Sequence, residues 1–154
     1  MANEHLMELL KHKKAVSAYL SVIVSNLLKR AIEHDDSKFS PEEFSTFEQA
    51  TPRLKDLVYG SDEYKQVLKE IEAAVQHHYQ VNRHHPEHFE NGINGMNLVD
   101  LIEMVCDWVA ASQRVKDGDV YKGLDINRDR FGISEQLLLI IKNTIDLLMA
   151  SQDC

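Results

Sequence analysis

Apolar residues recur at helical spacing along most of the chain and predict a mostly α-helical protein. Residues 4–33 contain no glycine or proline and predict one long helix that ends at His34 and Asp35. Most of the glycines and prolines fall between helical segments, where they are expected to interrupt the helices. The apolar stripe of the first helix comprises Leu6, Leu9, Leu10, Val16, Tyr19, Leu20, Ile23, Leu27, Leu28 and Ile32.

Capping signals divide the middle of the chain into shorter helices. Ser40, followed by Pro41 and Glu43, predicts a helix start with a capping box. Another short segment is expected from Thr51-Pro52 to about Gly60. A serine-capped helix is then expected over residues 61–80.

The second half of the chain predicts two helices and two loops. Residues 81–96 have no periodicity, and a loop of this length is usually functional or disordered. Asn97 and Asp100 predict the start of a helix that runs to about Lys116, followed by a polar loop over residues 117–132. Ser134 is expected to cap a last, apolar helix. We therefore expect a single all-α domain over residues 1–154, with about five to six helices.

Composition changes this picture little but excludes some classes of protein. The formal net charge of −8 argues against a general nucleic-acid coat, which needs a basic surface. No apolar run approaches the roughly 18 residues that a membrane span requires, and the N-terminal residues do not resemble a signal peptide. Cys106 and Cys154 do not make a disulfide framework. We therefore expect a cytoplasmic protein.

Histidines concentrate in one stretch of the sequence. Five of the eight lie within residues 77–88, where a helix gives way to the predicted loop. Clustered imidazoles commonly share a divalent metal, although surface decoration is the alternative. His78 is preferred to His77 because it extends the apolar face of its helix. The choice between His84 and His85 stays open.

Two further groups of residues strengthen the metal hypothesis. His34 and Asp35 lie at a helix end, where both could turn toward one ion, or where His34 could simply stabilise the helix terminus. Asp100, Glu103 and Asp107 recur at helical spacing and share one face. That face is either a source of ligands or an ordinary solvated surface.

Taken together, these motifs carry a resemblance. The sequence His34-Asp35-x-x-Lys38, a later helix-end histidine with a His-His pair, and a late aspartate resemble the HD-domain superfamily of all-α metal-dependent phosphohydrolases. A closer resemblance, over roughly residues 30–135, is to a small uncharacterised family of bacterial and phage proteins. It rests on three motifs: His34-Asp35-Asp36-Ser37-Lys38-Phe39 with Glu42-Glu43, then His78-x-x-x-Asn82-x-His84-His85-Pro86, then Glu103-Met104-x-Cys106-Asp107-Trp108.

The resemblance implies an HD-like helical fold and assigns roles to single residues. It implies that Lys38 faces a phosphate. Glu103 is a candidate ligand, general base or partner that orients a histidine. The implied metal ligands are His34, Asp35, His78, His84, His85 and Asp107. Mixed histidine and carboxylate ligands suit one or two Mn, Fe, Co, Ni or Zn ions better than Mg alone.

His12 is the histidine that a pattern match would add first. On an unbroken helix it lies roughly 33 Å from His34, because each residue advances the helix by ~1.5 Å. Either the helix breaks near Ser25-Asn26, a partner chain supplies His12, or it is not a ligand. We favour the last.

The predicted function is hydrolysis of a nucleotide or another small phosphoester, and the nucleotide rests on the resemblance alone. Three alternatives stay open: a metal-binding or nucleotide-sequestering protein without turnover, an all-α nucleotide pyrophosphohydrolase, and a di-iron HD oxygenase. A homodimer is compatible with the sequence, and no membrane partner is expected. The candidate anion-binding residues are Asn82, Arg83, Arg128 and Arg130.

Overall fold

A computed structural model describes residues 2–114 and 118–151, and every regular element in these residues is helical. The predicted all-α class is confirmed. The described residues form seven α-helices and three short 3-10 helices, more than the five to six helices expected. The HD-like arrangement and the single domain stay predictions. Contacts within the chain divide it into two units, residues 1–34 and residues 35–154, which are described separately.

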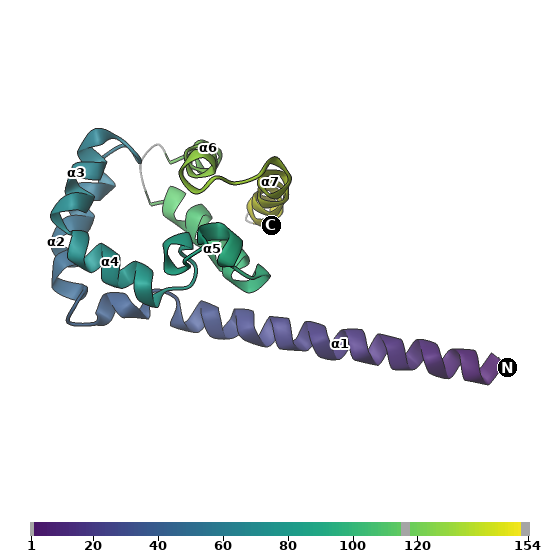
Figure 1. Cartoon of the computed structure of the whole chain (residues 1–154). Coiled ribbons are helices and arrows are strands. Elements are labelled where there is room, and N and C mark those ends of the chain that lie inside the picture. Colours follow the sequence, from purple (N-terminus) through teal and green to yellow (C-terminus); the bar gives the residue numbers. More distant parts are fainter. Residues whose placement is uncertain (1, 115–117, 152–154) are drawn as a thin grey trace. The chain divides into compact units, whose positions relative to one another are not determined.

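The first unit is a single long helix, α1 (Ala2–Glu33), which is unbroken as the sequence predicts (Figure 1). Good helix formers without glycine or proline explain its continuity. The 22 residues between His12 and His34 therefore correspond to roughly 33 Å along the axis. One ion cannot contact both histidines of the same chain.

The sequence of α1 bears on the expectation that no apolar run approaches the length of a membrane span. Within the residues that the structure describes, one candidate span inside Asn3–Phe39 is long and apolar enough to cross a membrane, with a mean hydropathy of 1.3 over 18 residues. That test considers length and composition only, and soluble helices also pass it. The longest stretch without a charged residue is the fourteen residues from Ala15 to Leu28.

The second unit begins with η1 (Asp36–Phe39) and α2 (Phe44–Lys55). The predicted capping box at Ser40 is wrong, because α2 begins at Phe44 and its N-cap residue is Glu43. The Glu43 carboxylate accepts hydrogen bonds from two histidine rings and is not turned back on the backbone. The expected break at Pro52 is also wrong, since Pro52 lies inside α2, in its last turn.

The next two elements are α3 (Asp62–Glu70) and α4 (Glu72–Val81). Ser61 caps α3 as predicted, and its Oγ accepts a hydrogen bond from the Tyr64 amide at 3.1 Å. The sequence predicted one helix here, but the backbone breaks at Ile71, with φ −109° and ψ 24°. Ile71 is buried against residues of α2 and α3, so packing outweighs the propensity to continue the helix.

The predicted irregular segment over residues 81–96 is confirmed apart from two single turns, η2 (Pro86–His88) and η3 (Gly92–Gly95). The helix expected after it is α5 (Leu98–Ser112), which Asn97 and Asp100 start with a reciprocal capping box. The expected end near Lys116 lies outside the described residues.

The polar loop expected over residues 117–132 is wrong within the described residues, since they form α6 (Val120–Phe131). Asp119 caps it, and Val120 and Leu124 are buried in the core despite the polar residues around them. The last helix, α7 (Glu135–Ala150), is capped by Ser134 as predicted.

Two apolar clusters hold the second unit together. One joins α5, α6 and α7 around Met104, Val105 and Ile145, and the other joins α2 and α3 around Ala50 and Val67. The candidate site is built from residues of η1, α4, the loop after α4, and α5. Helix α5 belongs to the first of these clusters, so the site residues on α5 are held by a packed core.

Candidate metal centre

Asp35 opens the second unit with a backbone conformation that is uncommon for its residue type. Its φ is 60° and its ψ is 16°, the left-handed region, and it is the only non-glycine residue of the described chain with positive φ. Aspartate tolerates this conformation better than most residues, at a cost of order 1 kcal/mol. Such strain concentrates at functional sites, and here it sets the direction of the Asp35 carboxylate.

His78 lies in the last turn of α4 and is held by Glu43. The His78 Nδ1–H donates to Glu43 Oε2 at 2.9 Å, and Glu43 itself is fully buried. In the neutral ring this bond leaves Nε2 with its lone pair, and Nε2 lies 3.3 Å from Asp35 Oδ1. Two electron-rich atoms at this distance are stabilised by a cation between them.

Other residues of the same network reinforce the position of His78. His77 also donates to Glu43, from Nδ1 to Oε1 at 2.7 Å. Asn82 Nδ2 donates to Ser37 Oγ at 2.7 Å, and Ser37 in turn donates to Glu43 Oε2 at 3.0 Å. The carboxylate of Glu43 therefore orients one histidine of the cluster and is itself oriented by several donors.

His84 and His85 are adjacent in sequence, and both face the same centre. Adjacent side chains diverge in a helix or a strand, but here the non-helical backbone after α4 brings their ring centroids to 4.1 Å. The His84 Nε2 lies 3.4 Å from Asp35 Oδ1. The structure thus brings both His84 and His85 to the candidate metal centre, whereas the sequence left the choice between them open.

One ligand atom from each of Asp35, His78, His84 and His85 lies within 4.8 Å of the others. His78 and His84 are almost fully buried, whereas the Asp35 side chain is 20% exposed. Three imidazoles and one carboxylate are a ligand set typical of first-row transition metals. These four residues, called the His3Asp cluster below, form a candidate metal centre with solvent access at Asp35.

His85 gives the most direct sign of a missing partner. Its Nε2 is buried and makes no hydrogen bond within the described residues. Burial, helped by His84 and His78, lowers the pKa of His85 to about 2. The ring is therefore neutral at physiological pH, and a neutral imidazole is the form that binds metals.

Helix α5 supplies two further carboxylates. Glu103 Oε1 lies 3.3 Å from His84 Nδ1, on the opposite side of that ring from Asp35. A carboxylate oxygen of Asp107 lies within 4.8 Å of one of Asp35. Glu103 therefore contacts the ring nitrogen of His84 that is not the one near Asp35, and Asp107 extends the candidate site beyond the His3Asp cluster.

Not all of the acidic residues on α5 face the site. Asp100 is fully buried and accepts hydrogen bonds from Arg83 Nε at 3.1 Å and Arg83 Nη2 at 3.0 Å. It also accepts from the Asn97 amide at the start of the helix. Asp100, Glu103 and Asp107 therefore do not form a common acidic surface of the kind that an all-α pyrophosphohydrolase uses to hold magnesium.

The remaining predicted site residues occupy different surroundings. Lys38 Nζ donates to Asp35 Oδ2, at the exposed side of the cluster. Arg130 donates to Tyr79 Oη at 3.2 Å and contacts Glu87, and the Tyr79 ring centroid lies 4.9 Å from that of His85. Arg128 is exposed and pairs with Asp129. His34 directly precedes Asp35 in the chain, and its role as a ligand stays a prediction.

Sequence reasoning quoted Glu43 and Ser37 within the motifs but gave neither a role in the site. Both have a complete local explanation, since Glu43 fits a capping box and Ser37 lies in a short polar turn. Their role depends on the start of α2 contacting the end of α4, where Glu43 meets His77 and His78. The available signals were their presence in the motifs and the spacing of His78 and Asn82, which are four residues apart on one helix face.

The family profile of DUF5662, described as a family of unknown function, matches residues 1–147. The chain belongs to this family. Comparisons with curated proteins and with solved structures gave no match. DUF5662 membership therefore brings no substrate or cofactor with it, and the chemistry must be argued from the side chains.

Proposed function

We propose that the chain binds a divalent transition metal in the His3Asp cluster and catalyses the hydrolysis of a small phosphoester or phosphoanhydride. The observation that carries the proposal is the convergence of four ligand atoms, one from each residue, within 4.8 Å. One of the four residues is His85, whose ring is neutral and whose buried Nε2 makes no hydrogen bond within the described residues. A divalent ion held there supplies a Lewis acid that activates water and offsets phosphoryl charge.

The chain's own residues fit this chemistry. Glu43 fixes the tautomer of His78 so that Nε2 points into the cluster, and Glu103 is placed to do the same for His84. The 3.3 Å contact between Glu103 Oε1 and His84 Nδ1 favours this orienting role for Glu103 over a role as general base. Lys38 lies on the exposed side, where an ammonium group stabilises negative charge that develops on a phosphoryl oxygen.

The ligand set also bears on the metal and on its number. Imidazole-rich sites favour Mn, Fe, Co, Ni or Zn over Mg, which prefers oxygen ligands. Asp35 lies close to both the histidines and Asp107, so it is placed to bridge two ions. We include His34 as a further ligand because it adjoins Asp35 in sequence.

The substrate is proposed from resemblance and charge. The HD-like motifs favour a nucleotide, and Asn82, Arg83, Arg128 and Arg130 are the candidates for contacts with its phosphates. A cytoplasmic location is proposed because two cysteines do not make a disulfide framework.

A structural metal is the second candidate, and one observation favours it. Three imidazoles and one carboxylate complete the tetrahedron that closed zinc sites adopt. In that case the ion stabilises the fold and no turnover occurs. The partial exposure of Asp35 argues for an open position.

The test combines metal content, spectroscopy and turnover on the full chain. The chelated protein is reloaded separately with Mn, Fe, Co, Ni and Zn, and bound metal is measured by mass spectrometry. Hydrolysis of p-nitrophenyl phosphate, nucleoside monophosphates and nucleoside triphosphates is then assayed. His85→Gln is compared with His12→Gln, which removes an exposed histidine from α1.

We expect stoichiometric metal in the parent protein and in His12→Gln, and loss of metal and turnover in His85→Gln. Lys38→Met should keep the metal but lose turnover, whereas Lys55→Met, at an exposed position of α2, should keep both. Metal binding without hydrolysis of any of these substrates would leave the structural reading in place. Absence of metal under every loading condition contradicts both readings.

A further inference from the structure

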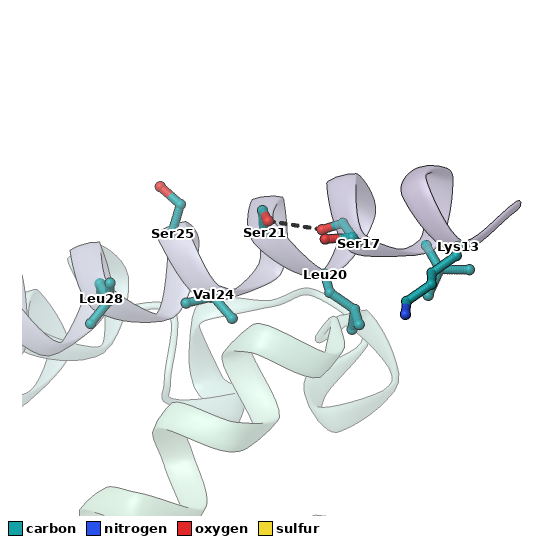
Figure 2. Close-up of a pocket in the computed structure, with 8 residues that line it drawn as sticks. Lys13, Ser17, Leu20, Ser21, Val24, Ser25 and Leu28 are labelled. Carbon is teal, nitrogen blue, oxygen red and sulfur yellow. Dashed lines mark hydrogen bonds between the residues drawn. The ribbon is translucent and has the colours of Figure 1, made fainter. Parts of the chain in front are cut away.

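Helix α1 presents a long apolar face to solvent. Leu6, Leu9 and Leu20 are each more than half exposed, and Val16 and Ile23 are more than 40% exposed. Figure 2 shows Leu20, Val24 and Leu28 projecting from the helix, with Ser21 bonded back to the Ser17 carbonyl. An isolated helix is marginal in water, and most helical stability comes from packing an apolar face. This face therefore requires a covering partner.

The spacing of the face indicates another helix as that partner. Residues 6, 9, 13, 16, 20, 23, 27 and 30 follow the alternating spacing of three and four residues that is typical of a coiled coil, and they are called the seam below. Apolar residues occupy six of these eight positions. The six are Leu6, Leu9, Val16, Leu20, Ile23 and Leu27. The two exceptions are Lys13 and Arg30.

A bilayer is a poor match for this helix. The fourteen uncharged residues between Lys14 and Lys29 extend roughly 21 Å, whereas the hydrocarbon core is about 30 Å thick. That stretch also contains Ser17, Ser21, Ser25 and Asn26.

The partner must match a helix that is roughly 48 Å long, because each of its 32 residues advances the axis by ~1.5 Å. Another copy of α1 has the required length.

We propose that α1 pairs with α1 of a second copy in an antiparallel coiled coil. Charge selects the direction. In a parallel pair, Lys13 faces Lys13 and Arg30 faces Arg30 across the seam. In an antiparallel pair centred between Val16 and Leu20, Lys13 faces Ile23 and Arg30 faces Leu6 of the second copy. The two like-charge contacts are thereby removed.

The ends of the helix support the same direction. Glu4 and Glu8 lie in its first two turns, and Lys29 and Arg30 lie near its C-terminus. An antiparallel pair places Glu4 and Glu8 of each copy near Lys29 and Arg30 of the other. Lys11, Lys13 and Lys14 then lie opposite the uncharged residues 22–25. The opposed helix dipoles are favourable in the same arrangement.

The contact is large enough for a stable dimer. A seam roughly 48 Å long and about 10 Å wide covers on the order of 1,000 Å² over the two copies. That is the size at which specific protein interfaces begin. This inference does not depend on the metal or on the proposed hydrolysis.

Oligomeric state is measured on the full chain by analytical ultracentrifugation over a concentration series. Leu20→Glu places a charge in the seam, and Ser25→Glu is the control, since Ser25 is exposed on the same helix and points away from Leu20 and Val24 in Figure 2. We expect a dimer for the parent and for Ser25→Glu. In Leu20→Glu the dissociation constant should rise by at least about 100-fold. Circular dichroism verifies that Leu20→Glu keeps a folded second unit.

Direction is measured by distances between single nitroxide labels, in a background with Cys106 and Cys154 changed to serine. A label on His5→Cys should give a separation of roughly 39 Å in the antiparallel pair and less than about 20 Å in a parallel one. A label on Ser17→Cys, near the centre, should give a short distance.

Four results would overturn the proposal. The first is a monomer throughout the concentration series, and the second is an equal loss of dimer affinity in both glutamate variants. The third is a short distance between the two labels at position 5. The fourth is a monomer that floats with phosphatidylcholine–phosphatidylserine vesicles. The last result would identify α1 as a membrane helix. The first, with α1 protected from proteolysis, would indicate that the second unit covers it.

Discussion

The Nδ1 atom of His78 lies 2.9 Å from Oε2 of the fully buried Glu43, and this contact fixes which nitrogen of His78 faces Asp35. A buried carboxylate bonded to a histidine ring on the side away from the metal is a common feature of metal sites. Here Glu43 comes from the start of α2 and His78 from the end of α4.

Glu43→Gln should lower the affinity for the proposed metal by about 10- to 100-fold, because the amide no longer holds the His78 proton on Nδ1 with a charged acceptor. Glu42→Gln is the control, since Glu42 is exposed and adjacent in sequence. Affinity is measured by competition with a chromophoric chelator. Equal affinities in the two variants would contradict the orienting role of Glu43.

Metal addition should raise the melting temperature of the chelated protein. At a free metal concentration about 100 times Kd, the gain in unfolding free energy is about 2.7 kcal/mol, which corresponds to roughly 5–10 °C for a chain of this size. His85→Gln should lose most of this shift, whereas His12→Gln should keep it. Differential scanning calorimetry with and without metal measures the effect. An undiminished shift in His85→Gln would remove that residue from the ligand set.

Arg83→Ala should destabilise the second unit by about 2 kcal/mol. The change removes both hydrogen bonds that Arg83 donates and leaves the buried Asp100 carboxylate with fewer donors. Arg128→Ala, at an exposed pair, should change the unfolding free energy by less than about 0.5 kcal/mol. Urea unfolding followed by circular dichroism compares them. A near-zero effect of Arg83→Ala would indicate that its side chain is available for an anion.

Stability should fall at alkaline pH through Tyr64. Burial, together with the nearby Tyr59, raises the pKa of Tyr64 to about 12. Above the ordinary tyrosine pKa of about 10, the unfolded chain releases this proton while the folded chain keeps it. The contribution of Tyr64 is therefore complete below about pH 10 and is lost as the pH rises toward 12, by at most about 1.4 kcal/mol per pH unit.

Unfolding in urea between pH 9 and pH 11 tests this prediction, with phenolate absorbance as a second readout. Tyr64→Phe should show a flatter dependence of unfolding free energy on pH than the parent, and Tyr19→Phe on α1 should not. The same slope in all three proteins would contradict the assignment.

The sequence predicted what depends on local periodicity and on neighbouring residues. The long first helix, the caps at Ser61, Asn97 and Ser134, and the irregular segment after α4 all follow from such signals. The histidine stretch indicated a candidate metal site for the same reason, because three of the four candidate ligands lie close together in sequence. These features need little information about packing.

What the sequence could not predict depends on contacts between distant elements. Ile71 interrupts a helix because of burial, and Val120 and Leu124 stabilise a helix in a segment that looks like a polar loop. Glu43 serves a histidine of another helix although its own neighbourhood suggests a capping box. Each case is one in which tertiary packing outweighs local preference.

The spacing of the His3Asp cluster along the chain has a consequence for folding. His78, His84 and His85 lie within eight consecutive residues, while Asp35 lies 43 positions before His78. Under the proposed metal binding, the unfolded chain would already offer all three histidines within one short segment, and metal bound there would reduce the net stabilisation of the native state. Of the four candidate ligands, only Asp35 requires the native fold to join the histidines. It is the candidate ligand through which an ion would distinguish the folded chain from the unfolded one.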